Sequence, residues 1–399
     1  MESLYTSFYH QLKNADSIFK RYLFDDIDWN HRLICILGAR GSGKTTMLLQ
    51  TIKAKYGKAP RHVLYASMDH IWFSGNTLYS LGEQFVINGG KVLFLDEVHK
   101  YKNWSQEIKN LYDSFPSLKI VFTGSSILEI YRGDADLSRR VVQYTLHGLS
   151  FREYLELSKV MEIGKISLTD LLDNHVEIAQ DITQKTHILS HFNNYLRYGF
   201  FPYFKEGISV YPNKLRQTVN VVLETDLPVI ENINYYSIEK IKRLLYIIST
   251  LVPFTPNVTE LSNQIGISRN SLLQYLHYLE KAQIVNTLED ETKILRKLTK
   301  PEKIFLGNTN LCYAFALNVP PEKGNLRETF FYNQLSVQES VTSSKQTDFI
   351  VNGKYSFEVG GKNKTAKQIA GLPDSYLALD DIETGYANKI PLWMFGIMY

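Results

Sequence analysis

One octapeptide near the amino end limits what this chain can fold into more than any other feature. Residues 38–45 read Gly-Ala-Arg-Gly-Ser-Gly-Lys-Thr, which matches G-x-x-x-x-G-K-[ST] at every fixed position. An apolar run at 32–37 precedes it, and a helical pattern with Met47, Leu48 and Leu49 follows. This order of strand, glycine-rich loop and helix predicts a phosphate-binding loop of the P-loop type.

The residues of this loop have separate expected roles. The glycines let successive backbone N–H groups face the phosphates. Lys44 is positioned for the β- and γ-phosphates, and Thr45 for a magnesium ion. We therefore expect ATP and Mg²⁺ as cofactors. The expected cofactor-binding residues are Gly38, Arg40, Gly41, Ser42, Gly43, Lys44, Thr45 and Thr46.

A second motif supports the same site. Residues 92–97, Val-Leu-Phe-Leu-Asp-Glu, form an apolar run that closes on two carboxylates. In P-loop ATPases an aspartate here holds magnesium, and the next glutamate accepts a proton from the attacking water. We assign Asp96 to the metal together with Thr45, and Glu97 to general-base catalysis. Alone, the two acids would fit an ordinary solvated turn, but downstream of the phosphate loop they favour a catalytic site.

Strand and helix patterns alternate around these motifs. Further strands are expected at 62–68, 91–95, 119–123 and 141–146, with helices at 78–86 and 105–115. Short alternating units of this kind predict an α/β fold with a doubly wound parallel sheet. From about residue 150 to 297 the pattern is helical. Apolar runs at 303–306, 347–351 and 355–359 then predict a second, smaller α/β domain.

The helical part contains a pattern typical of a winged helix-turn-helix. Residues 258–279 read as helix, turn, helix, with Thr259 and Ser268 as expected caps and Gly266 in the turn. Residues 282–288 would begin a wing hairpin. In a DNA reader the exposed face of the second helix would present Arg269, Asn270, Ser271, Gln274 and Tyr275. Because this helix carries few positive charges, DNA binding and a structural or protein-binding role both remain open.

Composition narrows the class of protein only slightly. The chain has 44 basic and 41 acidic residues, a balance that does not by itself indicate nucleic acid as a partner. Its two cysteines, Cys35 and Cys312, exclude a disulfide framework and favour a reducing cytoplasm. We expect no signal peptide and no membrane span, because the sequence lacks an apolar run of about 18 residues.

Together these motifs resemble the predicted bacterial and archaeal ATPases of the AAA superfamily that carry a conserved C-terminal region of unknown function. The similar segments cover most of the chain. They are 96–100 with Trp104, 122–126, 136–140, 149–154 and 199–202. Two positions depart from the family pattern. Gly148 replaces a proline, and Arg139 replaces the glycine before the second arginine.

The resemblance implies further catalytic residues. Ser125, or with less support Ser126, would sense the γ-phosphate or orient water. Arg140 would be an arginine finger, in a neighbouring subunit or within the chain, because a guanidinium neutralises charge on the γ-phosphate oxygens. Arg139 and Arg140 also fit a surface basic pair, and which arginine acts stays open. A finger acting on a neighbour would require a homo-oligomer.

The C-terminal region of this family is similar to restriction-endonuclease-like nucleases. An acid on a helix, an acid on one strand, and an acid and a lysine on the next strand form the layout, here Glu328, Asp348, Glu358 and Lys362. Two carboxylates would hold magnesium, and the lysine would stabilise developing charge. The lysine lies two positions later than usual, after two glycines that would fit a bulge. An inactive nuclease fold used for docking is the alternative.

Five parts are expected from these patterns. They are an N-terminal arm (1–30), an AAA-like P-loop ATPase domain (31–155), a helical lid or linker (156–235), a winged helix-turn-helix (236–297) and a restriction-endonuclease-like domain (298–399). We predict an ATP-binding, ATP-hydrolysing protein whose nucleotide state controls a DNA-associated or nuclease-like C-terminal module. The alternative is an ATP-dependent signalling or scaffolding switch that acts on protein partners through an inactive C-terminal domain.

Overall fold

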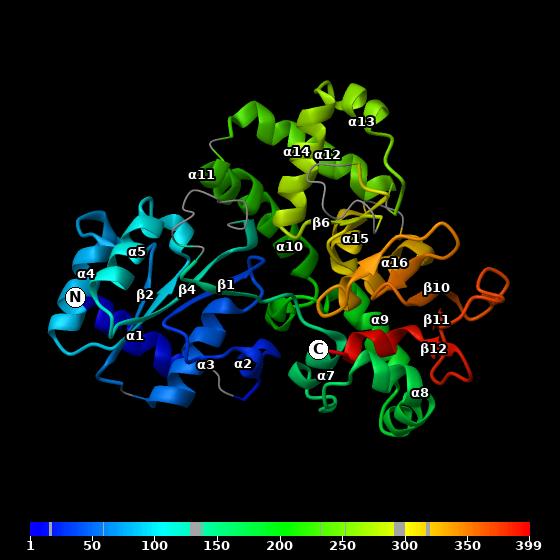
Figure 1. The fold of residues 1–399 in the computed structure, drawn as a ribbon, viewed down its shortest axis with the longest axis horizontal. Helices are drawn as coiled ribbons and strands as arrows, with labels where there is room; N and C mark the ends of the chain where they lie inside the picture. Colours follow the sequence, from blue (N-terminus) through cyan, green and yellow to red (C-terminus); the bar gives the residue numbers. More distant parts are fainter. Residues whose placement is uncertain are drawn as a thin grey trace. The chain divides into compact units, whose positions relative to one another are not determined.

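The chain forms two compact units in a computed structural model (Figure 1). The first unit comprises Met1–His147 and Glu224–Ile233, and the second comprises Gly148–Leu223 and Asn234–Tyr399. The chain therefore returns to the first unit for one short segment. The structure describes residues 1–15, 18–58, 60–127, 137, 139–231, 233–251, 253–290, 300–316 and 320–399.

A parallel sheet forms the centre of the first unit. Its five strands lie in the order β2-β3-β4-β1-β5. They are β1 (Leu33–Gly38), β2 (Val63–Ser67), β3 (Val92–Asp96), β4 (Lys119–Ser125) and β5 (Val142–Thr145). The predicted parallel α/β sheet is confirmed. Apolar runs predict such strands well because helices cover both faces of a parallel sheet, so that nearly every residue is buried.

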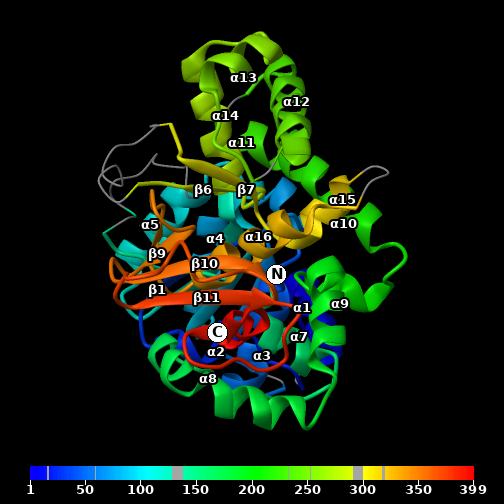
Figure 2. The same cartoon turned by 90° about the vertical axis from the view of Figure 1, so that its right-hand side faces the viewer.

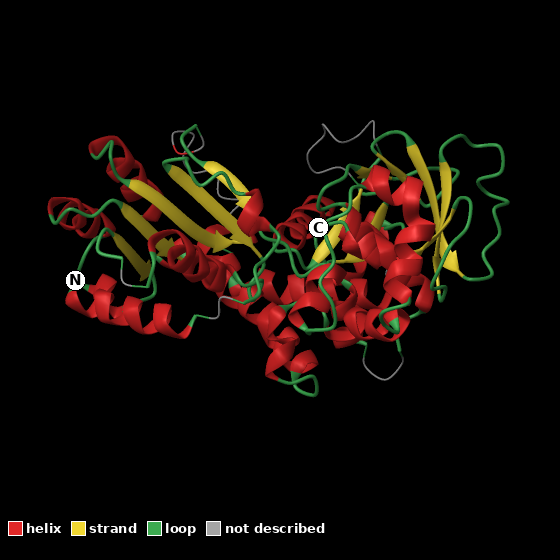
Figure 3. Ribbon diagram, turned by 90° about the horizontal axis from the view of Figure 1, so that it is seen from below, coloured by secondary structure: helices red, strands yellow, loops and turns green. Residues whose placement is uncertain are grey.

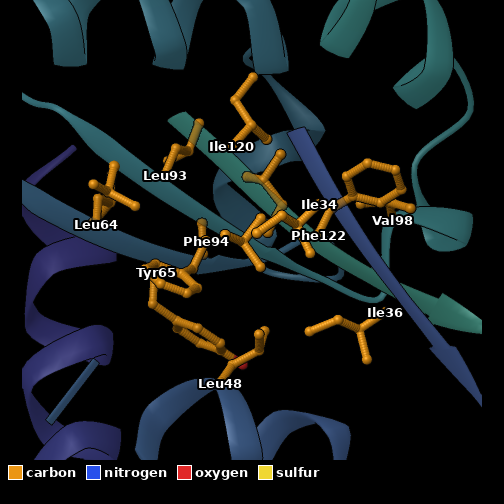
Figure 4. Close-up of a cluster of buried hydrophobic side chains, with 14 of the residues drawn as sticks. Ile34, Ile36, Leu48, Leu64, Tyr65, Leu93, Phe94, Val98, Ile120 and Phe122 are labelled. Atoms are coloured by element: carbon orange, nitrogen blue, oxygen red, sulfur yellow. The ribbon is translucent and has the colours of Figure 1, made fainter. Parts of the chain in front are cut away.

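Helices lie on both faces of this sheet, as Figure 3 shows. α1 packs against α3 and β2, whereas α4 packs against α5. The core between the layers contains Ile34, Leu93, Phe94 and Phe122 (Figure 4). The helices of this unit are α1 (Glu2–Asn14), α2 (Leu23–Asp26), α3 (Lys44–Tyr56), η1 (Ile71–Ser74), α4 (Leu78–Ile87), η2 (Val98–Lys100), α5 (Trp104–Ser114) and α11 (Leu227–Glu231).

Helices make up the first part of the second unit. They are α7 (Phe151–Leu157), α8 (Leu168–Thr183), α9 (Ile188–Tyr198), η4 (Pro202–Glu206) and α10 (Tyr211–Val221). A π-helical turn, η5 (Val222–Asp226), follows α10. α7 begins with a capping box between Ser150 and Glu153. Ser150 Oγ and Arg152 Nε also donate to the carbonyl oxygen of Tyr399, at 2.5 and 2.9 Å, so this segment anchors the residues after the buried helix η7 (Leu392–Ile397).

A helix-turn-helix with an antiparallel strand pair follows. It consists of α12 (Tyr235–Leu251), α13 (Val258–Ile265), α14 (Arg269–Lys281), β6 (Val285–Leu288) and β7 (Lys303–Leu306). Gly266 adopts the left-handed conformation expected of the turn, and Ser268 caps α14 as predicted. The cap of α13 is Asn257, not Thr259. Asn257 accepts from the backbone of Glu260, and Thr259 lies inside the helix.

The remaining strands form a mixed sheet with the order β12-β11-β10-β9-β8. Their bounds are β8 (Val341–Thr342), β9 (Phe349–Val351), β10 (Tyr355–Gly361), β11 (Ser375–Asp380) and β12 (Lys389–Pro391), preceded by α15 (Thr309–Phe315) and α16 (Lys323–Leu335). β10 pairs with β9 antiparallel and with β11 parallel, and α16 packs against β10 (Figure 2). β7 pairs with β6 and not with this sheet, so the strand pair crosses the predicted boundary at residue 297. In the part of the chain that the structure describes, no helix is both long and apolar enough to cross a membrane.

Candidate active site

The candidate site lies where β1, β3 and β4 end. Parallel strands place their carboxyl ends at one edge of a sheet, which is where ligands bind in open α/β folds. The phosphate loop follows β1, the acidic pair Asp96 and Glu97 follows β3, and β4 ends at Ser125. Gly38 and Ser125 are register partners on the paired strands β1 and β4. The sheet order thus brings all three predicted segments together.

The phosphate loop needs its glycines. Gly41 and Gly43 have φ values of 83° and 97°, a left-handed conformation that side chains rarely adopt. At Gly38 an added Cβ would lie 2.4 Å from the carbonyl oxygen of Leu146. α3 begins directly after the loop at Lys44, so its free N–H groups and positive dipole end lie beside the loop. This is the backbone arrangement that an anion such as phosphate requires.

Lys44 is buried with neutral partners. Its Nζ donates to the carbonyl oxygens of Gly38 at 2.7 Å and Ala39 at 3.0 Å. Burial lowers its pKa to about 8, against the opposing effect of Asp96 and Glu97. An ammonium group held only by carbonyl dipoles in a buried position gains strongly from an anionic partner.

Asp96 is fixed by hydroxyl groups from three neighbouring segments. Its Oδ2 accepts from Thr45 Oγ1 at 2.6 Å and from Tyr65 Oη at 2.8 Å, and its Oδ1 accepts from Thr123 Oγ1. Burial, and then Asp96 itself, raise the pKa of Tyr65, which keeps this phenol protonated as a donor. Tyr65 lies on β2 and Thr123 on β4, the two neighbours of β3. The sequence motifs did not single out either residue.

The donor set at this point suits magnesium. Mg²⁺ prefers oxygen ligands and usually takes one or two protein oxygens together with substrate phosphates and water. Thr45 Oγ1 and Asp96 Oδ2 are such oxygens, 2.6 Å apart beside the phosphate loop. The predicted metal residues therefore fit a magnesium ion that would be shared with a bound nucleotide.

Glu97 is held in an unusual conformation. Its backbone is left-handed, with a φ of 55°, and its N–H donates to Thr123 Oγ1 at 3.0 Å. Its carboxylate forms an ion pair with Lys100, which also binds Asp69 at 2.8 Å. A glutamate held in left-handed backbone geometry at a strand end indicates strain of the kind found at functional sites. Thr123 contacts both acids, so it fixes their relative position.

The end of β4 meets a buried histidine. Ser125 N donates to His99 Nδ1 at 3.4 Å, and both residues are buried. Burial lowers the pKa of His99 to about 4, so its ring is neutral at neutral pH. His99 Nε2 lies 3.8 Å from Asp226 Oδ1, and Asp226 Oδ1 lies 3.4 Å from Arg40 Nη1 in the phosphate loop. Ser126 is also buried, and its hydroxyl has no hydrogen-bond partner among the described residues.

Arg21 supports the loop from the N-terminal arm. This buried guanidinium donates to the carbonyl oxygens of Ser42 and His147, the latter at 2.7 Å. No local pattern marks Arg21 or Asp226 in the sequence, because each reaches the site only through the packing of a distant segment. A buried arginine beside the loop also adds positive charge where phosphate would bind.

The candidate arginine finger lies apart from these groups. Arg140 Nε and Nη2 donate to Asp113 Oδ1 and Oδ2 of α5, at 3.0 and 3.2 Å. Arg139 is exposed. The neighbouring Asp136 and Ser138 of the family-like segment lie outside the described residues. The role of Arg140 therefore stays a prediction.

The predicted nuclease residues lie in the second unit. Glu328 of α16 pairs with Lys303 of β7, and Glu358 of β10 pairs with Lys364 Nζ at 2.6 Å. Asp348 Oδ2 accepts from the backbone of Val359 at 2.9 Å. Burial raises the pKa of both glutamates, and the nearby Asp348 raises them further, against the effect of the lysines. The three acids therefore share one neighbourhood.

Lys362 does not occupy the position next to Glu358, whereas Lys364 does. β10 ends at Gly361, so the alternation of side chains along a strand does not extend to residue 362. The chain then turns, with Lys364 N donating to Gly361 O at 2.9 Å, and Lys362 is exposed. Lys364 packs over Gly360, where an added Cβ would lie 2.7 Å from Lys364 Cβ. The two glycines thus allow a later lysine to fold back onto the strand.

Comparison with known proteins agrees with the first part of this picture. Residues 30–155 match a family described as an AAA domain, and residues 189–323 match a domain of unknown function, DUF8612. Uncharacterized protein MJ1637 of Methanocaldococcus jannaschii is 29% identical over 285 residues, which are 68% of this chain and 60% of that protein. The chain thus spans about 60% of the length of this curated relative.

Solved structures give a limited likeness. AMPPCP-bound DnaA from Aquifex aeolicus is 17% identical, with a TM-score of 0.25, over 70% of this chain and 86% of that one. The Hsp104–ADP complex of S. cerevisiae is 13% identical, with a TM-score of 0.32, over 69% of this chain and 41% of that one. On the match at residues 30–155, the chain carries an AAA-type P-loop ATPase domain, followed by a region whose family has no known function.

Proposed function

We propose that this chain binds ATP with Mg²⁺, hydrolyses it, and uses its nucleotide state to control the C-terminal module. The contact of Thr45 Oγ1 with Asp96 Oδ2 at 2.6 Å supports this most directly, because it joins the phosphate loop to the acidic strand end. Titration of the purified chain with labelled ATP and Mg²⁺ tests the proposal, together with a measurement of phosphate release. We expect saturable binding and steady turnover. Absence of saturable uptake would remove the proposal.

The roles of the residues follow from their positions. Lys44 and the loop amides would hold the β- and γ-phosphates, and Thr45 with Asp96 would hold the metal. A bound magnesium ion neutralises phosphate charge. Glu97 would accept a proton from water once its carboxylate leaves Lys100. Ser125, at the adjacent strand end, would contact the γ-phosphate or the water.

Arg140 is the proposed arginine finger, and its substitution should reveal it. Arginine fingers raise kcat by about 10³-fold or more, so we expect Arg140→Ala to lower ATP turnover to a similar extent while ATP binding persists. Phosphate release should be measured over a range of protein concentrations, since a finger acting on a neighbouring subunit makes turnover depend on concentration. Arg139→Ala is the matched control. If only Arg139→Ala is inactive, the assignment moves to Arg139, and wild-type turnover in both variants would exclude a finger in this pair.

We propose DNA as the partner of the C-terminal module. The exposed side of α14 presents Arg269, Asn270 and Gln274, as predicted for a recognition helix. Phosphate contacts release counterions, so the logarithm of DNA affinity should fall with the logarithm of salt concentration with a slope of about −3 or steeper. Fluorescence anisotropy with a labelled duplex measures this slope. Arg269→Ala should reduce its magnitude by about 1. A flat salt response would contradict the DNA proposal.

Metal-dependent cleavage of DNA is the proposed chemistry of the acidic cluster. If Asp348 and Glu358 hold Mg²⁺, Asp348→Ala should reduce cleavage by about 100-fold or more, since even outer-shell changes at metal sites cost 10–100-fold. Asp374→Asn, at an exposed acid of the same unit, is the control. Because Lys364 and not Lys362 contacts Glu358, we expect Lys364→Ala to impair cleavage more than Lys362→Ala. Unchanged cleavage in Asp348→Ala would discard the assignment.

A protein-directed switch is the second candidate function. Two of the three acids in the cluster already pair with lysines, Glu328 with Lys303 and Glu358 with Lys364. Such internal pairing is what an inactive nuclease fold used for docking would show. A flat salt response together with no cleavage under any divalent metal would favour this function over the first.

A further inference from the structure

Asp226 lies in the nucleotide site although it comes from far along the chain. Its segment, Glu224–Ile233, belongs to the first unit, whereas the residues on both sides belong to the second. Asp226 is the last residue of the π-helical turn η5, and α11 continues from it and packs against η2. π-Helical turns are rare and occur mostly at functional sites. The segment therefore places one carboxylate beside the phosphate loop.

The environment of this carboxylate is unusual. Asp226 is only 3% exposed, and its Oδ2 has no hydrogen-bond partner among the described residues. Burial raises its pKa, because charge is costly in a poorly solvated position. Its Oδ1 lies 3.4 Å from Arg40 Nη1 and 3.8 Å from His99 Nε2. A buried carboxylate held by so few contacts depends strongly on each of them.

Arg40 is the partner of Asp226 that a ligand can take away. The other charged groups facing Asp226 are Lys44, Glu97 and Lys100, and each is already bound elsewhere. His99 is neutral because burial lowers its pKa to about 4. Arg40 belongs to the phosphate loop, and its side chain is 34% exposed. Its single 3.4 Å contact with Asp226 leaves most of the guanidinium fork available to another anion.

A triphosphate in the loop would act on this pair in two ways. Phosphate oxygens form bidentate, charge-assisted hydrogen bonds with a guanidinium, which are stronger than one long contact to a carboxylate. The triphosphate also brings several negative charges next to Asp226, and like charges repel strongly where water is excluded. Both effects favour the separation of Asp226 from Arg40.

We infer that Asp226 is a positioning residue of the nucleotide site, which holds Arg40 in the nucleotide-free protein and releases it when the γ-phosphate binds the guanidinium. This inference rests on the proposed binding of ATP. Release weakens the hold of the first unit on α11. Because the segment is covalently continuous with α10 and α12, its release changes the constraint on both ends of the chain that lead into the second unit.

Hydrogen exchange of the full-length wild-type protein tests this without any substitution. Mass spectrometry should follow peptides covering residues 222–231 without nucleotide, with Mg²⁺–ADP and with a non-hydrolysable Mg²⁺–ATP analogue, under conditions where binding is saturable. We expect exchange in this segment to be about ten-fold faster with the ATP analogue than without nucleotide, and nearly unchanged with ADP, which lacks the γ-phosphate. Unchanged or slower exchange with the ATP analogue, despite saturable binding, would overturn the inference alone. Absence of saturable binding would remove the proposed function and this inference together.

The substitution Asp226→Asn gives the reciprocal test. Linkage requires that a contact broken by the nucleotide oppose its binding, so removing the charge should tighten binding of the ATP analogue by about ten-fold. It should also speed exchange of residues 222–231 without nucleotide. The control is Glu224→Gln, an exposed acid in the same segment, which should match the wild type in both measurements. Weaker or unchanged binding in Asp226→Asn, with a normal circular dichroism spectrum, would assign Asp226 a purely structural role and overturn the inference.

Discussion

Replacing Glu97 with glutamine is expected to slow ATP hydrolysis by about 10²–10⁴-fold while Mg²⁺–ATP binding persists. Glutamine keeps the size and polarity of the side chain but cannot accept a proton from water. It also loses the ion pair with Lys100, yet the backbone of residue 97 remains bound to Thr123 Oγ1 at 3.0 Å. The loop residues that would contact the phosphates are untouched by this change, so affinity should remain close to that of the wild type.

Single-turnover phosphate release and a separate binding titration measure these two effects. Glu83→Gln, at an exposed glutamate of α4 in the same unit, is the matched control and should turn over at the wild-type rate. Equal turnover in Glu97→Gln and wild type would discard Glu97 as the general base. A loss of binding together with turnover would instead assign Glu97 to nucleotide affinity.

Replacing Lys44 with alanine is expected to weaken nucleotide binding by about 100-fold or more. The ammonium would form charge-assisted hydrogen bonds with two phosphates, each worth about 1.5–3 kcal/mol. The same change should leave the fold intact, since in the nucleotide-free protein the buried ammonium contacts only the carbonyl oxygens of Gly38 and Ala39. A thermal melt without nucleotide should therefore be close to that of the wild type.

Equilibrium titration with a fluorescent ATP analogue measures this loss. Lys58→Ala, which removes an exposed lysine shortly after α3, is the control and should bind normally. Wild-type affinity in Lys44→Ala would contradict the predicted role of the loop. A large drop in melting temperature would show that Lys44 is needed for folding, and the binding result would then have to be repeated with Lys44→Met, which keeps the aliphatic stem.

The parts of the site that the sequence predicted are those built from neighbouring residues. The phosphate loop needs its glycines at fixed positions, and the helix start at Lys44 follows directly from the loop. The acidic pair after β3 is marked by the apolar run before it. For the same reason, the turn at Gly266 and the cap at Ser268 were predictable. The cap of α13 was misplaced because Thr259 and Asn257 are both good caps, and only the position where the helix begins distinguishes them.

The C-terminal site shows where local spacing misleads. Counting along a strand favoured Lys362, but strand alternation ends with β10 at Gly361. The turn that follows brings Lys364 back over Gly360, so that its ammonium lies 2.6 Å from Glu358 Oε2. A spacing rule applies only as far as the regular element that produces it, and the end of that element depended on a turn that the pattern did not predict.

The sequence by itself determined the α/β class, the phosphate loop and the acidic strand end, because each is encoded in contiguous residues with a local conformational requirement. Only the tertiary structure decided which groups complete the site. Tyr65 and Thr123 reach Asp96 because β2 and β4 flank β3, and Asp226 reaches Arg40 because a distant segment packs back against η2. Such contacts depend on strand order and on buried packing between remote segments, and neither of these leaves a periodic or local signal in the chain.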